Sequence, residues 1–387
     1  MHAAIVTETW PPEVNGVALT VQGLVLGLRE LGHRVSLVRP TQPAHPRLPG
    51  DESMLIRSAA LPRYPGLRLG FPAGSRLLKH WQADRPDAIY VATEGPLGWS
   101  AVRSAKRLGI PAATGFHTRF DEYMARYGVG ALTPIAFAWM RRFHNAAAAT
   151  LVPTVELAEF LQSRGFQRVQ RLGRAVDTAL FDAARRSESL RATWGANKDD
   201  LVVIHVGRLA PEKNLDLAVR SYREIQKQRP NSRFVIVGDG PTRATLAAAN
   251  PDIIFTGVKR GSELAESFAS GDLFLFPSLS ETFGNVTLEA MASGVATVAY
   301  DYGAAREYLR DGLHGRAIAR DDEAGYIAAA LQLAIDDTGR LKMAAAAREA
   351  MLPLHPRQVS ENFAALLSSL GPAPHLSTDP SKQERAA

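Results

Sequence analysis

The sequence predicts an α/β protein built from two doubly wound domains that face each other across a cleft. Short runs of β-branched residues alternate with helical segments, a pattern typical of parallel sheets covered by helices. The pattern pauses around residues 173–200 and then begins again, and 387 residues are too many for one ordinary core. We therefore expect two Rossmann-like sheets, whose ligands lie beyond the carboxyl ends of the strands.

The first half contains short apolar runs separated by helical stretches. A helix is expected at residues 17–31, and the Gly32-His33 break after it leads into the next strand. The strands expected in this half are residues 3–7, 35–38, 87–92, 112–116 and 150–152.

The second half repeats this arrangement, with a helix after each strand, and ends in an amphipathic helix at residues 359–367. The last residues are rich in Pro, Ser and charge and have no apolar period, which predicts disorder. The strands expected here are residues 201–206, 233–237, 253–256, 273–276 and 295–299. The domains are expected at residues 1–172 and 173–353, followed by a helical segment at 354–370 and a disordered tail at 371–387.

The composition is that of a globular protein, with 46% hydrophobic and 22% charged residues. Cysteine is absent, which excludes disulfides and thiolate catalysis and fits a reducing compartment. The chain begins with a strand-like run in place of a signal peptide, and no apolar run is long enough to cross a bilayer. A cytoplasmic protein is expected.

The net charge of +6 is spread thinly along the chain. It forms no Lys/Arg block of the kind that marks a nucleic-acid tail, so no nucleic-acid partner is expected. Residues 61–81 combine Arg with aromatic residues, including Trp81, and this suits the headgroup layer of an anionic membrane. Peripheral contact with the inner face of the plasma membrane and an ordinary solvated loop are equally compatible with this stretch.

Two glutamates frame the segment that follows the strand at residues 273–276. Glu281 stands in the loop before a helix that opens near Gly284, and Glu289 stands further along this helix. The first backbone N–H groups of a helix are free to bind an anion. A diphosphate bound there has a hydroxyl-bearing group on either side, and each carboxylate can accept hydrogen bonds from one of them. This layout fits a nucleotide-sugar.

A second set of residues follows the first strand of the second half. Gly207 and Arg208 end the strand, and Pro211 and Glu212 suit a helix start. Lys213 does not, because a cation in the first turn opposes the helix dipole unless an anion lies nearby. Arg208 and Lys213 are therefore expected to neutralise the phosphates of a nucleotide and of a departing diphosphate.

Two strand ends in the first half add further candidates. Gly16 opens a helix after the first strand and lets a ligand approach the backbone closely. His117 ends another strand, where it can hydrogen-bond a sugar hydroxyl. A lone histidine is more often structural, but the expected position at the cleft favours a functional role here. Asp121 and Glu122 follow as candidates for the acceptor side.

Several motifs are missing from the chain. No Asp-x-Asp pair occurs, and such a pair commonly holds a divalent metal on a nucleotide diphosphate. Neither a P-loop nor the Gly-x-Gly-x-x-Gly dinucleotide fingerprint is present, which weakens an oxidoreductase interpretation. We therefore expect no cofactor and no metal, and the cations Arg208 and Lys213 take the role of the metal.

Together these residues resemble the GT-B glycosyltransferases, in particular the retaining family 4, over the chain up to about residue 370. The most specific part is the Glu-x7-Glu segment, residues 281–289, followed by Ala-Met-Ala-Ser-Gly. The N-terminal half is similar to bacterial α-mannosyltransferases and glycolipid glycosyltransferases. The other matching elements are Asn15-Gly16-Val17, Phe116-His117-Thr118, Val176-Asp177…Phe181 and Gly207-Arg208…Glu212-Lys213.

The resemblance implies that the donor nucleotide lies on the C-terminal domain. Glu289 would bind the ribose hydroxyls, and the backbone N–H groups near Gly284, Asn285 and Val286 would bind the diphosphate. Glu281 would contact the hydroxyls of the donor sugar.

The resemblance also implies a catalytic set in which Glu281 is joined by three further residues. Arg208 and Lys213 would stabilise the departing diphosphate, while His117 and the donor-binding Gly16 would approach from the N-terminal, acceptor-binding domain. The last helix would return to that domain.

The implied reaction is the retaining transfer of a hexose, most simply mannose from GDP-mannose, to a lipid or lipid-linked saccharide. Front-side attack assisted by the leaving phosphate is expected, and a covalent intermediate on another residue stays open. The alternatives are a glycolipid synthase that uses UDP-glucose or UDP-glucuronate, a nucleotide-sugar epimerase, and a non-enzymatic binder of nucleic acid or membranes.

Overall fold

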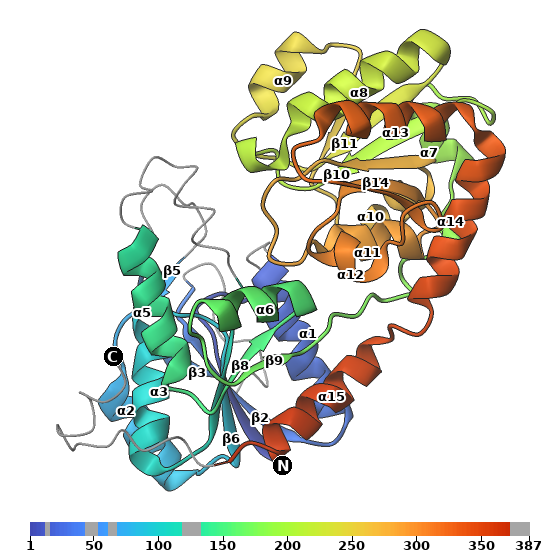
Figure 1. Ribbon diagram of the computed structural model, residues 1–387. Helices are drawn as coiled ribbons and strands as arrows, with labels where there is room; N and C mark the ends of the chain where they lie inside the picture. Colours follow the sequence, from blue (N-terminus) through green and yellow to red (C-terminus); the bar gives the residue numbers. More distant parts are fainter. Residues whose placement is uncertain (12–15, 43–52, 61–67, 118–132, 372–387) are drawn as a thin grey trace. The chain divides into compact units, whose positions relative to one another are not determined.

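The computed structural model describes residues 1–11, 16–42, 53–60, 68–117 and 133–371 (Figure 1). These residues form two compact units, each with its own parallel sheet. Unit 1 holds the described residues up to Gly173 together with those from Arg357 onward, and unit 2 holds Arg174–Pro356. The fold class predicted from the sequence, two doubly wound α/β domains, is confirmed.

Unit 1 is organised around a sheet with strand order β3-β2-β1-β6-β7-β8-β9, in which all neighbours are parallel. The chain enters the middle of the sheet and winds outward in both directions, so the strand order reverses between β1 and β6. A separate antiparallel pair joins β4 (Ser58–Ala60) to β5 (Arg68–Gly70). The strands of the main sheet are β1 (His2–Val6), β2 (Arg34–Pro40), β3 (Met54–Ile56), β6 (Ala88–Val91), β7 (Ala112–Gly115), β8 (Ala149–Val152) and β9 (Val169–Arg171).

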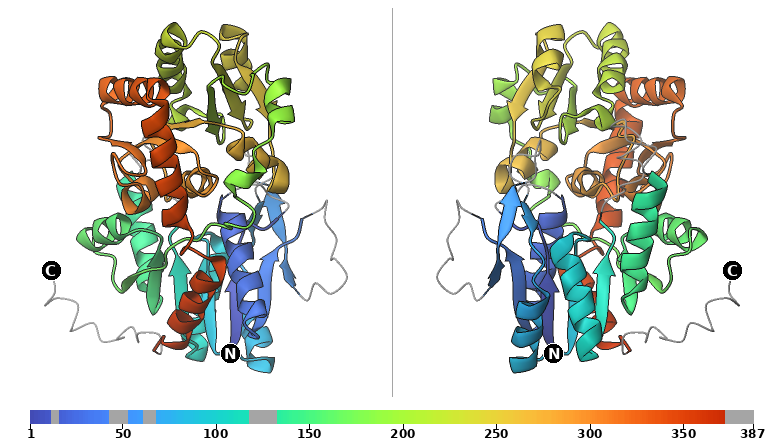
Figure 2. Two further views of the ribbon diagram at one scale, coloured as in Figure 1. Left: turned by 90° about the vertical axis from the view of Figure 1, so that its right-hand side faces the viewer. Right: turned by 90° about the vertical axis from the view of Figure 1, so that its left-hand side faces the viewer.

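Helices cover both faces of this sheet, because each strand of a parallel sheet is buried on two sides. Ile5 of β1 belongs to a cluster shared with α1 and α15, and Val6 belongs to the cluster on the other face. The last helix, α15, lies beside α1 (Figure 2), and its Phe363 packs edge-on against Tyr90 with ring centroids 5.0 Å apart. The helices are α1 (Gly16–Glu30), α2 (Gly74–Ala83), α3 (Pro96–Leu108), α5 (Thr133–Asn145), α6 (Val155–Ser163) and α15 (Pro356–Ser368).

Unit 2 has a second parallel sheet, with strand order β12-β11-β10-β13-β14-β15. Here the order reverses between β10 and β13, and in such sheets ligands bind at this switch point. The strands are β10 (Val202–Val206), β11 (Arg233–Val237), β12 (Ile254–Gly257), β13 (Leu273–Phe276), β14 (Ala296–Tyr300) and β15 (Gly315–Ile318).

The helical segments of unit 2 bury their apolar sides in two clusters, one on each face of the sheet. They are the 3-10 turns η2 (Ala183–Arg185) and η3 (Pro211–Lys213) and the helices α7 (Glu188–Thr193), α8 (Leu215–Gln228), α9 (Arg243–Ala249), α10 (Gly261–Ala269), α11 (Asn285–Ala292), α12 (Ala304–Tyr308), α13 (Glu323–Ile335) and α14 (Asp337–Met351).

The expected strands lie within two residues of the observed ones, because their apolar runs are long enough to be recognised. The strands that the sequence did not predict are β3, β4, β5, β9 and β15. Each has only three or four residues and lies at the edge of a sheet or outside both main sheets, where one side faces solvent and the apolar signal is weak.

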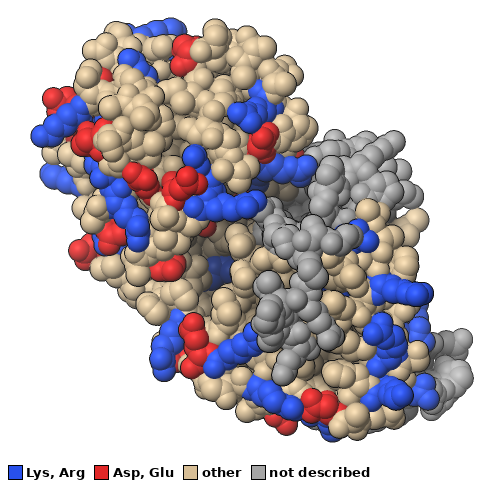
Figure 3. Space-filling model, turned by 180° about the vertical axis from the view of Figure 1, so that it is seen from behind, with Lys and Arg blue, Asp and Glu red and all other residues tan. Residues whose placement is uncertain are grey.

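Three helices of unit 1 carry positive charge and no acid. The segments α2, α3 and α5 contain no Asp or Glu. The helices α2 and α3 are packed together, and Trp99 of α3 lies 4.8 Å from Trp139 of α5 between ring centroids. Figure 3 shows Lys and Arg side chains gathered on one side of the unit drawn at the bottom. The basic residues of the three helices are Arg76, Lys79, Arg103, Lys106, Arg107, Arg141 and Arg142.

Trp81, an aromatic residue of the stretch 61–81, is fully buried in the cluster between α2, α3 and the sheet, because its helix turns this side chain inward, so it is not part of a membrane-facing surface. Residues 61–67 of the same stretch lie outside the described residues, while Phe71 is exposed. Among the described residues, no helix is both long and apolar enough to span a bilayer.

Arg191 ties α7 to the sheet of unit 2. Its side chain is fully buried, and Nη1 donates to Asp272 Oδ2 at 3.0 Å and to the Ser270 carbonyl at 2.9 Å. Nη2 donates to the Asp200 carbonyl at 2.6 Å. Asp272 Oδ2 also accepts from the N–H of Val202, the first residue of β10. The buried guanidinium thus joins three segments of the chain.

Replacing Arg191 with Met is expected to destabilise unit 2 by about 3–5 kcal/mol, since it removes the donor to two carbonyls and leaves Asp272 with only Arg186 and the Val202 N–H. Urea unfolding of the full chain measures this. The control is Arg220→Met, which removes a half-exposed arginine paired with Asp216 and Glu323 and should cost less than about 1 kcal/mol. An Arg191→Met loss no larger than that of the control would contradict the assigned role.

Candidate functional site

The site begins where β13 ends and α11 starts. The chain crosses a loop, residues 277–284, between the two elements. Gly284 caps α11 at φ 93°, a left-handed conformation that favours glycine. The Thr287 N–H donates to the Gly284 carbonyl at 3.0 Å, whereas Asn285 and Val286 stand too early in the helix to have an intrahelical acceptor. The three predicted anion-facing residues therefore stand at a helix N-terminus.

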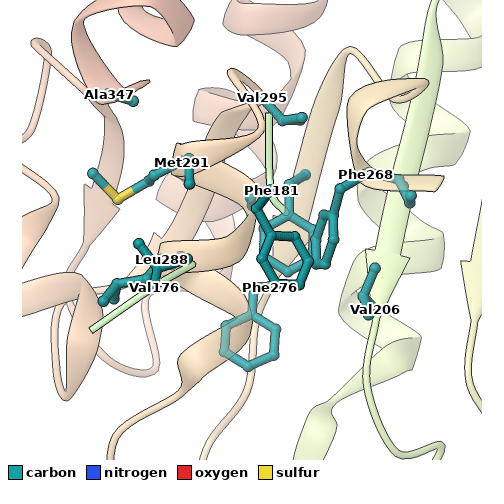
Figure 4. Packing of buried hydrophobic residues seen from close by; sticks show 14 of the residues in the cluster. Val176, Phe181, Val206, Phe268, Phe276, Leu288, Met291, Val295 and Ala347 are labelled. Atoms are coloured by element: carbon teal, nitrogen blue, oxygen red, sulfur yellow. The ribbon is translucent and has the colours of Figure 1, made fainter. Parts of the chain in front are cut away.

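The direction of α11 is fixed by its buried face. Leu288 and Met291 point into an apolar cluster that also contains Val176 and Phe276 (Figure 4). A shift of the helix would expose these side chains to water, at about 25 cal/mol for each Å² of apolar surface. The N–H groups at its N-terminus are therefore held in place before any ligand arrives.

The loop before α11 is held by backbone hydrogen bonds to two neighbouring loops. The Leu279 N–H donates to the Glu212 carbonyl at 2.8 Å, and the Ala304 N–H donates to the Phe283 carbonyl at 2.6 Å. The Phe283 side chain is buried. The loop has a fixed path, which is the condition for electrostatic preorganisation of a site.

Lys213 and Glu281, both predicted from the sequence, contact each other. Lys213 Nζ forms a hydrogen-bonded ion pair with Glu281 Oε1, and the two side chains are only 15% and 16% exposed. The ammonium also lies 5.8 Å from the centroid of the Phe276 ring, a cation–π contact. Two residues that are 68 positions apart in the sequence thus meet beside the N-terminus of α11.

The local structure at Lys213 differs from the expectation of a helix start at Pro211. Residues Pro211–Lys213 form the 3-10 turn η3, and Asn214, left-handed at φ 51°, separates this turn from α8. The cation is therefore outside the first turn of α8. The sequence predicted a phosphate as the anion beside Lys213, and the side chain that pairs with it in the structure is Glu281.

Arg208 follows β10 directly and is exposed. Its backbone is fixed on both sides, because the Gly207 N–H donates to the Val237 carbonyl at 3.0 Å and the Leu209 N–H donates to the Asp239 carbonyl at 2.9 Å. Within the described part of the chain, the guanidinium has no hydrogen-bond or ion-pair partner. The backbone of Arg208 is therefore held in place, while its cationic side chain has no partner among the described residues.

Glu289 lies one turn into α11 and is half-buried. Burial raises the pKa of its carboxyl from 4.5 to about 7. The described residues offer this carboxyl no hydrogen-bond donor and no cation. A poorly solvated carboxyl without a protein partner is typical of a ligand-binding group.

The remaining two predicted residues belong to unit 1. Gly16 is the first residue of α1 and is exposed, and apart from its own helix and adjoining residues no described atom lies within 4 Å of the place where a Cβ would stand. His117 follows β7, and its Nε2 is 2.8 Å from the Tyr90 hydroxyl. Asn15, Asp121 and Glu122, and Thr118 of the His117 motif, lie outside the described residues.

Two buried titratable side chains were not predicted. His205 of β10 is fully buried, and burial, opposed by a hydrogen bond to the Leu275 carbonyl and reinforced by Lys213, lowers its pKa to about 4. Burial raises the pKa of Glu8 to about 7, although Oε1 accepts from the Leu97 N–H at 2.9 Å. The signal in the sequence that could have identified these two residues is a polar residue inside or just after an apolar, strand-like run.

The described residues contain no group of three or more His, Cys, Asp or Glu side chains arranged to hold a metal ion. The charged groups beside the α11 N-terminus are instead the Lys213–Glu281 pair and, further along the helix, Glu289.

Comparison with known proteins agrees with this arrangement. The model described as "Glycosyltransferase Family 4" matches residues 14–180, and the model described as "Glycosyl transferases group 1" matches residues 200–336. The chain is 36% identical over 315 residues to the GDP-mannose-dependent alpha-mannosyltransferase of Mycolicibacterium smegmatis, covering 80% of this chain and 82% of that protein.

A more distant relative and a solved structure extend the comparison. The alpha-monoglucosyldiacylglycerol synthase of Acholeplasma laidlawii is 25% identical over 344 residues, covering 84% of this chain and 86% of that protein. The Anabaena protein Alr3699/HepE, solved in complex with UDP, superposes with a TM-score of 0.76 at 18% identity over 96% of this chain and 100% of the other, which shows a shared fold.

Both halves of the chain match glycosyltransferase models, and the identity to the mannosyltransferase extends over most of both proteins. The chain therefore belongs to the family 4 glycosyltransferases of the GT-B fold.

Proposed function

We propose that this glycosyltransferase moves a hexose, mannose from GDP-mannose, with retention of anomeric configuration to a lipid or lipid-linked saccharide. The donor is supported by the name of the relative from M. smegmatis, and the lipid acceptor by the name of the relative from A. laidlawii. A glycolipid synthase that uses UDP-glucose or UDP-glucuronate is the alternative that the same fold supports.

The observation that carries the proposal is the arrangement of free backbone N–H groups and charged side chains at the N-terminal end of α11. Its N-terminal N–H groups, at Gly284, Asn285 and Val286, suit a diphosphate. Glu289, which lies one turn further along and lacks a protein partner, suits the two hydroxyls of a ribose. Glu281 keeps one oxygen, Oε2, outside the bond to Lys213 and is assigned to a hydroxyl of the transferred sugar.

In the proposed reaction, the bond between the anomeric carbon and the phosphate oxygen breaks, and its electron pair stays on the diphosphate. The acceptor hydroxyl bonds to the same face of that carbon, and its proton passes to the departing phosphate. Lys213 and Arg208 stabilise the charge that develops there, since fixed cations act most strongly where transition-state charge appears. They take the role that a metal has in other enzymes, so we propose a reaction that needs neither metal nor cofactor.

Unit 2 is proposed to bind the donor and unit 1 the acceptor. Within unit 1, Gly16 offers a ligand an open backbone, and His117, oriented by Tyr90, is proposed to contact a sugar hydroxyl. Both groups stand after strands of a parallel sheet, at the edge where such sheets bind ligands.

The acid-free helices α2, α3 and α5 are proposed to rest on an anionic membrane, such as the inner face of the plasma membrane. Ile135 and Trp139, one turn apart on α5, are 69% and 53% exposed, and Arg142 follows on the same stripe. Exposed aliphatic and indole groups beside Arg and Lys suit the headgroup layer, where each cation is worth about 1 kcal/mol. Such a surface would bring unit 1 to a lipid acceptor.

A donor screen tests the proposed function. GDP-mannose at about 100 times its dissociation constant should stabilise the protein by about 2.7 kcal/mol in a thermal-shift assay, with or without EDTA. Transfer should require an acceptor, for which an alkyl mannoside serves as probe. Arg208→Ala should lower kcat by about 10²–10³, because it removes a cation from the departing diphosphate.

The matched control is Lys227→Ala on α8, an exposed lysine paired with Glu224, which should keep full activity. Stabilisation by UDP-glucose or UDP-glucuronate alone would replace the proposed donor, and turnover without an acceptor would favour an epimerase. No response to any nucleotide-sugar would reject the proposed function.

Glu289→Gln is expected to weaken GDP binding while stabilising the free protein. The ionised carboxylate accepts from the ribose, so GDP affinity in the wild type should rise as the pH increases through about 7 and level off above it. The variant should bind about tenfold or more weakly at pH 8, the loss expected for hydrogen bonds to a charged group. Calorimetric titration with GDP across this pH range measures both effects.

The effect on stability has the opposite sign. A carboxyl whose pKa is raised by folding favours its protonated form in the folded state, so ionisation makes no difference to stability below pH 4.5 and destabilises the fold as pH approaches 7. The Gln variant should therefore gain about 3 kcal/mol over the wild type at pH 8 and nothing at pH 4.5. A variant that binds GDP normally, or that loses stability at pH 8, would contradict the role of Glu289.

The membrane surface is tested with vesicles. Trp139→Ser combined with Arg142→Glu should reduce binding to phosphatidylcholine vesicles containing phosphatidylglycerol by about tenfold or more, because it removes an interfacial indole and reverses one charge. The matched control, Leu341→Ser combined with Lys342→Glu, changes an exposed apolar residue and an exposed cation on α14 of unit 2. Equal binding by both double variants would reject the surface.

A further inference from the structure

A buried histidine lies at the switch point of the unit 2 sheet. In the parallel pairing of β10 with β13, Val203 lies opposite Leu273 and Ile204 lies opposite Phe274, and the pairing of these two strands ends there. The next residue of β10, His205, therefore stands where the two strands separate. This separation occurs at the position at which sheets of this topology bind ligands.

The hydrogen bonds of His205 fix its tautomer. Nδ1 is 2.9 Å from the Leu275 carbonyl oxygen, and because a carbonyl only accepts, Nδ1 carries the proton. In the neutral ring, Nε2 is then an acceptor. The side chain is fully buried, and Nε2 has no hydrogen-bond partner among the described residues. A buried acceptor without a donor is unfavourable, so its partner is expected to come from outside the protein chain.

Nε2 faces an open place beside the loop that carries Arg208. If Gly207 had a Cβ, this atom would lie 3.5 Å from His205 Nε2, with no other described atom within 4 Å apart from those of the adjoining residues. Gly207 has φ +156°, in the region that favours glycine, so no side chain fills this place. A ligand atom or a water molecule at this position would lie 3.5 Å from Nε2, and because Nε2 itself is buried, a small shift of the loop is needed to shorten this distance to that of a hydrogen bond.

The protonation state restricts what this partner can be. Burial and the neighbouring Lys213, which is paired with Glu281, keep the pKa of His205 low, at about 4, so its ring is neutral near pH 7. A neutral Nε2 cannot donate to a phosphate oxygen, because both groups are acceptors. The partner must carry an O–H or N–H group. On a nucleotide-sugar, with the ribose assigned to Glu289, the remaining donors are the N–H groups of the base and the hydroxyls of the transferred sugar. His205 stands beside Arg208, Lys213 and Glu281, which are assigned to the departing diphosphate and the sugar, and this favours the sugar hydroxyls.

We propose that His205 Nε2 accepts a hydrogen bond from a hydroxyl of the transferred hexose, directly or through one bound water, and so helps to select the sugar. The assignment rests on the proposed function, because it needs a nucleotide-sugar bound at α11. On this assignment His205 lies beneath the loop at Gly207 and contributes to recognition of the sugar without contacting the phosphates.

The two nitrogens of His205 can be separated by substitution. His205→Asn keeps an N–H near the position of Nδ1, and hence the bond to Leu275, but has no atom at Nε2. His205→Gln places an amide oxygen or nitrogen near Nε2. The Asn variant should bind GDP with unchanged affinity and GDP-mannose about three- to tenfold more weakly, the range expected for one neutral hydrogen bond. The Gln variant should recover part of this loss.

A series of deoxy analogues of GDP-mannose makes the test specific. The analogue that lacks the hydroxyl bound by His205 should bind wild type and His205→Asn equally well, whereas every other analogue should keep the three- to tenfold difference. If the Asn variant does not fold, His205→Phe, which fills a similar volume without either nitrogen, takes its place in the series.

The outcomes separate this proposal from the proposed function. If the wild type binds no nucleotide at all, the proposed function fails. If the wild type binds normally but His205→Asn loses affinity equally for GDP and GDP-mannose, the histidine acts on the phosphates and the inference is overturned. It is also overturned if neither affinity changes, or if all deoxy analogues keep the same difference.

Discussion

The two sheets of this protein consist of parallel strands that are buried on both faces, and this constraint governs the rest of the structure. A parallel strand can be followed only by a crossover to the far end of the sheet, so the carboxyl ends of all strands in a unit gather along one edge. The loops along this edge of unit 2 carry Arg208, Lys213 and Glu281. Residues far apart in the sequence thus become neighbours because each stands just after a buried strand.

Within this arrangement the ion pair between Lys213 and Glu281 has two effects. It satisfies two side chains that are mostly withdrawn from water, and it places a cation beside the free N–H groups of α11. Partly buried pairs of this kind contribute little net stability, because desolvation offsets the attraction. In the reaction proposed here, the pair holds the cation in position before charge develops on the departing diphosphate.

Glu289 and His205 are polar groups of unit 2 whose burial is unfavourable. Among the described residues, the Glu289 carboxyl has no hydrogen-bond donor and His205 Nε2 has no hydrogen-bond partner. Stability lost at a site is commonly offset when substrate supplies the missing partner. Arg191 differs from both, because its buried guanidinium bonds to an aspartate and several carbonyls.

The sequence by itself determined the alternating architecture and the principal strands, because buried strands are continuous apolar runs, and it indicated that Gly284, Glu281 and Lys213 stand in the loops that follow them. It did not determine the edge strands, which are too short and too exposed to show an apolar signal. Only the tertiary structure decided that Glu281 is the anion beside Lys213, that Trp81 turns inward, and that His205 ends the ladder between two strands. These properties depend on contacts between segments distant in the chain, and no local pattern of residues encodes such contacts.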